Sequence, residues 1–178
     1  LAFDYPRRSK FFTKQLEHFL LLTREEKLDP LVMKGSYAGA MGYGQFIPSS
    51  YRSYAIDFDD DGIRNIVTNP IDAIGSVANY LSKHGWERNA TIAEALTKND
   101  VNSNFKTSLS LKEPDALELA SKINLPNKKY LQINFEDKEF WLGHKNLYDL
   151  SRYNRSSFYV MAVFLLSQEI DYAYRVKI

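Results

Sequence analysis

The sequence predicts a mainly α-helical chain with one small, partly β region near residues 100–142. Apolar residues recur at three- and four-residue spacing in several long stretches, which is typical of amphipathic helices. A polar stretch and then a short alternating one interrupt this pattern in the middle of the chain. The chain has 178 residues, of which 44% are hydrophobic and 25% charged, enough for one folded domain with a sizeable core.

The first predicted helix covers residues 8–27. Phe12, Leu16 and Phe19 fall on one face, and Lys14 lies between them. Residues 29–30 are Asp-Pro, which favours a short second helix because Asp caps a helix and Pro fits its first turn.

Three further helix starts follow in the first half and at the end of the chain. Pro-Ser-Ser at 48–50 can begin a helix, and Asn69-Pro70 opens a longer one that stops at Gly85. The last helix is expected from about 156 to about 174. No internal repeat is visible.

The middle of the chain mixes element types. Residues 91–98 and 116–123 are expected to form short helices, whereas 129–135 alternates and could pair with 139–142 as a hairpin. We therefore divide the chain into residues 1–90, a small mixed α/β excursion at 91–142, and a C-terminal helical segment at 143–178 that packs back on the first part.

Charge and cysteine content exclude several function classes. Lys and Arg total 23 against 22 Asp and Glu, so a net charge of +1 gives no general attraction to nucleic acid. There is no cysteine, which excludes disulfides, zinc-thiolate sites and thiol catalysis. No apolar run approaches the roughly 20 residues of a membrane-spanning helix.

An acidic loop at residues 57–67 matches the first half of an EF-hand, D-x-D-x-D-G-x. The loop departs from that pattern at position 12, which is Thr68, so a later carboxylate would have to close the site. The alternative is a solvated acidic turn, since Asp-Gly is a common turn pair. We expect calcium, held by Asp57, Asp59, Asp61, Asp72 and the main-chain carbonyl of Ile63.

A glycine-rich stretch at 35–48 surrounds Gln45 with aromatic residues and glycines. It lacks the lysine of a phosphate-binding loop. Glycines let a ligand approach the backbone, and a carboxamide can both donate to and accept from sugar hydroxyls. A tight connection between two helices, packed by its own aromatic residues, is the alternative.

Six blocks in a fixed order give the sequence a specific resemblance. The chain resembles the membrane-bound lytic murein transglycosylase B family of bacterial peptidoglycan-cleaving enzymes, most weakly across 88–130. The blocks are Tyr-Pro-Arg-Arg at 5–8, the glycine-rich stretch with its Gly-Ala-Met-Gly-Tyr-Gly-Gln-Phe core at 39–46, the acidic loop at 57–62, Asp-Ala-Ile-Gly-Ser-Val-Ala-Asn-Tyr at 72–80, His-Gly-Trp at 84–86, and Arg-Tyr-Asn-Arg-Ser at 152–156.

The resemblance implies a lysozyme-like helical core with a single EF-hand-like calcium loop. It implies cleavage of the β-1,4 bond between N-acetylmuramic acid and N-acetylglucosamine of peptidoglycan glycan strands. One Glu protonates the leaving oxygen and then acts as base on the muramyl C6 hydroxyl, which gives a 1,6-anhydro product. Such an acid needs a raised pKa, which an apolar pocket supplies.

The resemblance also implies which residues line the substrate cleft. For each tyrosine, packing within the core is the alternative, most of all for Tyr80, which lies on the apolar stripe of its helix. The residues expected to contact substrate are Arg7, Arg8, Ser36, Met41, Tyr43, Gln45, Tyr80 and Tyr153.

The catalytic Glu of the family is expected upstream of Leu1, outside this chain. Glu17, Glu25 and Glu26 lie on the polar side of an amphipathic helix, where a solvated role is expected. We therefore expect this polypeptide to be inactive alone, the alternative being a noncatalytic peptidoglycan- or calcium-binding module of the same fold. The resemblance further implies a periplasmic protein, often lipid-anchored to the outer membrane, and we expect a monomer.

Overall fold

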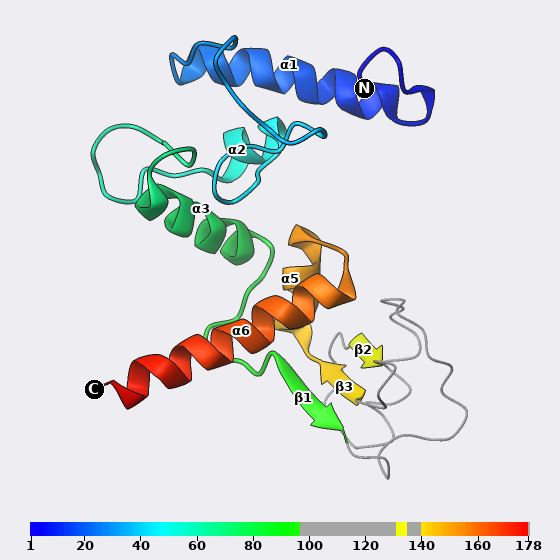
Figure 1. Cartoon of the computed structure of the whole chain (residues 1–178), viewed down its shortest axis with the longest axis vertical. Coiled ribbons are helices and arrows are strands. Elements are labelled where there is room, and N and C mark those ends of the chain that lie inside the picture. Colours follow the sequence, from blue (N-terminus) through cyan, green and yellow to red (C-terminus); the bar gives the residue numbers. More distant parts are fainter. Residues whose placement is uncertain (97–130, 135–139, 178) are drawn as a thin grey trace. The chain divides into compact units, whose positions relative to one another are not determined.

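A computed structural model describes residues 1–96, 131–134 and 140–177 of the chain (Figure 1). The chain divides into two compact units, Leu1–Lys83 and His84–Ile178. Each unit has its own elements and buried residues, and each is described here by itself.

The first unit is helical, with η1 (Pro6–Arg8), α1 (Ser9–Glu25), α2 (Pro48–Tyr54) and α3 (Pro70–Lys83). The predicted helix over 8–27 is confirmed as α1, which buries Phe12 and Leu22. The predicted helix start at Pro48 is also confirmed. The side chain of Gln15 on α1 accepts a hydrogen bond of 3.0 Å from the Ser49 N–H, so α1 satisfies a free donor in the first turn of α2.

Helix α3 begins where the sequence predicts, because the Asn69 side chain accepts from the Ile71 N–H at 3.0 Å and caps the first turn. The short helix expected at Asp29-Pro30 is wrong. The Asp29 carboxylate accepts from the Leu31 N–H at 2.9 Å, and this local bond forms a turn instead. Since Leu31 is 92% exposed, no packing extends the turn into a helix.

Within its described residues, the second unit contains a three-stranded antiparallel sheet in the order β1-β3-β2 and two helices. The strands are β1 (Ala93–Leu96), β2 (Leu131–Asn134) and β3 (Phe140–Gly143). Pairing of β2 with β3 confirms the predicted hairpin. The helix expected at 91–98 is wrong, because residues 93–96 pair along β3 and sheet pairing overrides a weak local preference. The helix expected at 116–123 lies outside the described residues.

The helices in the described part of the second unit are α5 (Lys145–Tyr153) and α6 (Ser157–Val176), and α6 confirms the last predicted helix. Leu147 of α5 and Val160 of α6 are both fully buried. The buried Asn146 amide accepts from the Glu87 N–H and donates to the Glu87 carbonyl, both at 2.8 Å, which ties α5 to the start of the unit. The expected packing of 143–178 on 1–90 stays a prediction. Within the described ranges, no helix has the length and apolar character needed to cross a membrane.

The packing of α1 gives a direct test of the first unit. Replacing Leu22, which is fully buried, by Ala should lower the free energy of unfolding by about 2–5 kcal/mol, because the change leaves a cavity. Leu20→Ala on the same helix is the matched control, since Leu20 is 55% exposed and should cost under about 0.5 kcal/mol. Urea denaturation measures both, and equal losses would contradict the burial of α1.

Candidate functional site

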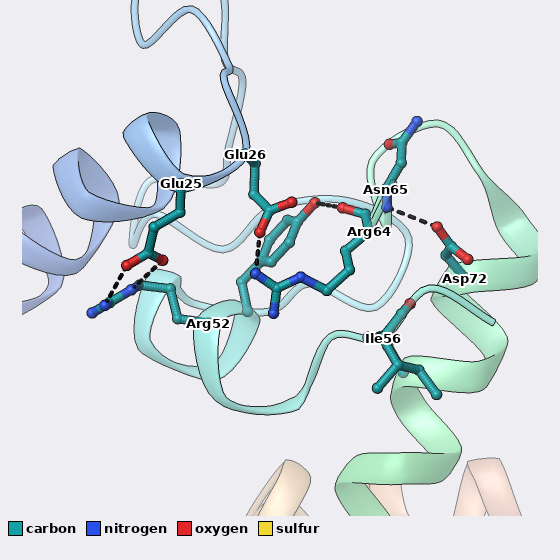
Figure 2. A network of polar contacts seen from close by, with 9 residues as sticks. Glu25, Glu26, Arg52, Ile56, Arg64, Asn65 and Asp72 are labelled. Carbon is teal, nitrogen blue, oxygen red and sulfur yellow. Dashed lines mark hydrogen bonds and ion pairs between the residues drawn. The ribbon is translucent and has the colours of Figure 1, made fainter. Parts of the chain in front are cut away.

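The acidic loop is fixed to α3 through the side chain of Asp72. This carboxylate is fully buried in the first turn of α3. One oxygen accepts from the Phe58 N–H at 2.8 Å and the other from the Asn65 N–H at 2.7 Å, the second of which Figure 2 shows. Because these two N–H groups lie in the two limbs of the loop, a single carboxylate closes it.

Three carboxylates meet inside this loop. Oxygens of Asp57, Asp59 and Asp72 all lie within 4.8 Å of one another. Carboxylates this close repel each other unless a cation lies between them, and hard oxygen ligands suit calcium. The backbone folds around Asp57, which accepts from the Asp61 N–H at 3.1 Å and the Gly62 N–H at 2.7 Å. The donor set therefore fits a divalent cation.

Asp72 thus reaches the site that Thr68 leaves open. Asp61, also expected as a ligand, is not part of the group of three, and its carboxylate accepts from the Ile63 N–H at 2.8 Å. The Thr68 hydroxyl accepts from the side chain of Asn65 instead. Two of the expected aspartates therefore gather with Asp72, while a role for Asp61 and the Ile63 carbonyl stays a prediction.

The glycine-rich stretch forms two consecutive turns. In the first, the Ser36 hydroxyl accepts from the Ala38 N–H at 3.3 Å and the Ala40 N–H at 3.2 Å. In the second, Met41 and Phe46 pair as an isolated bridge, so the chain between them reverses direction. The exposed Gln45 lies in this second turn with a φ of 49°, and its side-chain amide donates to the Gly42 carbonyl at 2.9 Å.

An aromatic cluster lies under the second turn. The Tyr80 ring on α3 is 5.8 Å from the Phe46 ring and 4.8 Å from the Tyr54 ring, measured between centroids. Tyr80 is only 9% exposed, so the structure supports the packing role that the sequence left open for it. Tyr43 in the same turn is 65% exposed.

Two open grooves flank the glycine-rich stretch. The larger, of about 430 Å³, includes Ser36 and Met41 together with apolar residues of α1. The smaller, of about 350 Å³, runs between Tyr43 and α3, where Ala73 and Val77 line it. The structure therefore places three predicted substrate residues on groove walls of the first unit.

The remaining predicted substrate residues lie elsewhere. Arg7 and Arg8 are exposed in η1, and the Arg8 guanidinium lies 4.5 Å from the centre of the Phe11 ring. Tyr153 belongs to the second unit, where its ring stacks on Tyr159 at 6.4 Å.

Sequence reasoning missed an ion-pair network between α1, α2 and the acidic loop (Figure 2). Arg52 on α2 donates to both carboxylate oxygens of Glu25, at 2.8 and 2.7 Å. The same guanidinium donates to Nδ1 of His18 at 2.7 Å. Arg64 in the loop pairs with Glu26. These pairs join residues that are far apart in sequence, so periodicity gave no signal for them.

Two members of the network, Glu25 and Arg52, have shifted pKa values. Hydrogen bonds from Arg52 hold the pKa of Glu25 below its usual value, and the same bonds raise the pKa of Arg52. Burial raises the pKa of the Tyr51 hydroxyl, which donates to the Arg64 carbonyl at 2.7 Å.

A general acid needs surroundings that raise its pKa, which is the opposite of the effect of Arg52 on Glu25. Glu25 is stabilised in its charged form, Glu26 is ion-paired, and Glu17 is exposed. Glu25 and Glu26 at the end of α1 are thus held by guanidinium groups and Glu17 in the middle of the helix faces solvent, whereas a general acid is typically placed in apolar surroundings.

Residues 1–168 match the Transglycosylase SLT domain family. The chain belongs to this family. It is 44% identical over 179 residues to the membrane-bound lytic murein transglycosylase B of Escherichia coli K12, covering 97% of this chain and 49% of that protein. This SLT domain chain therefore spans about half the length of the curated relative it matches.

Two solved structures of lytic transglycosylases share the fold of this SLT domain chain. Escherichia coli Slt35 in complex with calcium is 41% identical with a TM-score of 0.80, covering 97% of this chain and 57% of that one. Pseudomonas aeruginosa SltB3 in complex with NAG-anhNAM-pentapeptide is 32% identical with a TM-score of 0.73, covering 93% and 47%. These matches confirm the lysozyme-like, mainly α-helical fold predicted from the sequence.

The Arg52–Glu25 pair predicts a low Glu25 pKa. In a carboxyl NMR titration, the pKa of Glu25 should lie below the usual value for a glutamate, and Arg52→Gln should move it back toward that value. Because the folded pKa is lowered, the stabilisation by this pair should be present above the unfolded pKa and be lost as pH falls through the folded one. An unchanged Glu25 pKa in Arg52→Gln would contradict the assignment.

Proposed function

We propose that this chain is the substrate-lining and calcium-binding part of a lytic murein transglycosylase. The observation that carries the proposal is the match to the SLT domain family across residues 1–168, which includes both the glycine-rich stretch and the acidic loop. The reaction would be cleavage of the MurNAc–GlcNAc β-1,4 bond of peptidoglycan with formation of 1,6-anhydro-MurNAc. Its place in the cell would be the periplasm, in cell-wall turnover.

The exposed second turn of the glycine-rich stretch, between Met41 and Phe46, carries side chains suited to bind sugars. Gln45 is exposed and its amide nitrogen donates to the Gly42 carbonyl, which leaves its carboxamide oxygen to accept from a sugar hydroxyl or an N-acetyl N–H. Tyr43 adds an exposed ring beside the smaller groove, and such rings suit the apolar faces of sugars. Arg7 and Arg8 would meet the carboxylates of the glycan or its peptide.

The acid itself is proposed to come from outside these 178 residues. The carboxylates at the end of α1 serve ion pairs or face solvent, which does not suit proton donation at neutral pH. The chain alone would then bind glycan without cutting it. The same observation supports a second candidate, a noncatalytic peptidoglycan-binding module of the same fold.

Calcium is proposed to bind where Asp57, Asp59 and Asp72 gather. The relative Slt35 has a structure in complex with calcium, which supports the choice of ion. Bound there, the ion would neutralise the clustered carboxylates and hold the loop on α3, without a direct part in bond cleavage.

An activity assay distinguishes a part of a lytic transglycosylase from a noncatalytic peptidoglycan-binding module. We expect the 178-residue chain to release no anhydromuropeptides from purified sacculi, whereas the full-length protein that contains it should release them, as detected by mass spectrometry. Release by the short chain would overturn the proposal about the acid. A full-length protein that retains sacculi on a pull-down but never releases products would favour the noncatalytic module.

Calcium binding has a matched pair of test variants in the loop. Asp59 belongs to the group of three carboxylates, whereas its neighbour Asp60 does not. Asp59→Asn should weaken calcium binding by about tenfold or more in calorimetric titration, because it removes one charged ligand. Asp60→Asn should change the affinity little. Equal affinities for the two variants, or no calcium uptake by the unmodified chain, would contradict the site.

A further inference from the structure

The end of the acidic loop lies directly against the turn that carries Tyr43 and Gln45. The Ile66 carbonyl accepts from the Tyr43 N–H at 3.0 Å, and Ile66 is only 1% exposed. Gly42 approaches the same carbonyl so closely that a Cβ at this position would overlap it. The turn and the loop therefore meet at the Ile66 carbonyl, where a side chain at position 42 does not fit.

Residues 64–66 of the acidic loop make further contacts that hold them in place. The carbonyl of Arg64 accepts from the buried Tyr51 hydroxyl at 2.7 Å, and the Arg64 side chain pairs with Glu26, whose side chain is 11% exposed. The next residue, Asn65, donates its N–H to Asp72. Residues 64–66 thus connect the metal-binding carboxylates on one side to the second turn on the other.

We propose that residues 64–66 couple calcium binding to the position of the Tyr43–Gln45 turn, with Ile66 as the positioning residue. This inference rests on the proposed function, which assigns the acidic loop to calcium and the turn to glycan. Asp57, Asp59 and Asp72 would hold the ion together, and Asp72 accepts from the Asn65 N–H, so a bound ion would restrict where the Ile66 carbonyl can lie. The position of the turn then depends on that of the Ile66 carbonyl, because the Tyr43 N–H donates to this carbonyl and Gly42 packs against it.

Coupling of this kind is reciprocal. If calcium orders the turn, a ligand held by the turn must strengthen calcium binding by the same factor. Substitutions at the contact should therefore change calcium affinity even though they remove no ligand of the ion.

Two glycines provide the primary test. Gly42 and Gly39 both have positive φ, 68° and 80°, so Ala is strained at either position. A Cβ at Gly42 would strike Ile66, whereas a Cβ at Gly39 meets nothing within 4 Å. We expect Gly42→Ala to weaken calcium binding by about tenfold and Gly39→Ala to leave it nearly unchanged, measured by calorimetry on the 178-residue chain.

A second pair of variants avoids strain in the turn. Glu26→Gln removes the partner of Arg64, whereas Glu25→Gln removes the partner of Arg52 on α2 and has the same change in charge. Only Glu26→Gln should lower calcium affinity severalfold. Equal effects within each pair would overturn the coupling while leaving calcium binding itself intact.

Glycan binding with and without calcium measures the coupling directly. A soluble GlcNAc–MurNAc oligosaccharide should bind the unmodified chain about fivefold more tightly with calcium than with chelator, and this ratio should fall to one in Gly42→Ala. A general loss of stability would not bring this ratio of glycan affinities to one. A ratio of one in the unmodified chain would overturn the coupling, whereas no glycan binding in either condition would overturn the proposed function and the coupling together.

Discussion

The buried carboxylate of Asp72 is the constraint on which the acidic loop depends. A charged group without solvent requires hydrogen-bond donors, and Asp72 takes them from Phe58 and Asn65 in the two limbs of the loop. The loop can therefore close only when α3 has formed, because α3 carries this side chain. A residue of the following helix therefore closes the loop, whereas position 12 of the EF-hand pattern is Thr68.

Helix α3 supports more of the first unit than the acidic loop alone. The Ser76 hydroxyl accepts from the Ile56 N–H at 3.0 Å at the entrance of the loop. Gly75 leaves room for the Phe58 ring, which a Cβ there would strike. One turn further on, Tyr80 packs under the second glycine turn. A single helix thus sets the loop entrance, its closure and the support of the turn.

The parts that sequence predicts well are those determined by local pattern. Periodicity identified α1, α3 and α6, and the spacing of aspartates identified the loop. The strand at 93–96 could not be found this way, because its conformation depends on pairing with residues near 140. The ion pairs were missed for the same reason: Glu25 and Arg52 are 27 residues apart, so their contact exists only after α1 and α2 have packed. The glycines of residues 35–48 are consistent with ligand approach or with tight packing, and at Gly42 the missing side chain allows close contact with Ile66.

The two neighbouring glutamates at the end of α1 serve as ion-pair partners rather than as isolated acids. Glu25 binds α2 through Arg52, and Glu26 binds the acidic loop through Arg64 (Figure 2). A carboxylate held by a guanidinium stabilises structure only while it is ionised, and a general acid works only while it is protonated. The same residue cannot satisfy both requirements at neutral pH. These ion pairs fix α1, α2 and the loop to one another, so both glutamates have a structural role that depends on their charge.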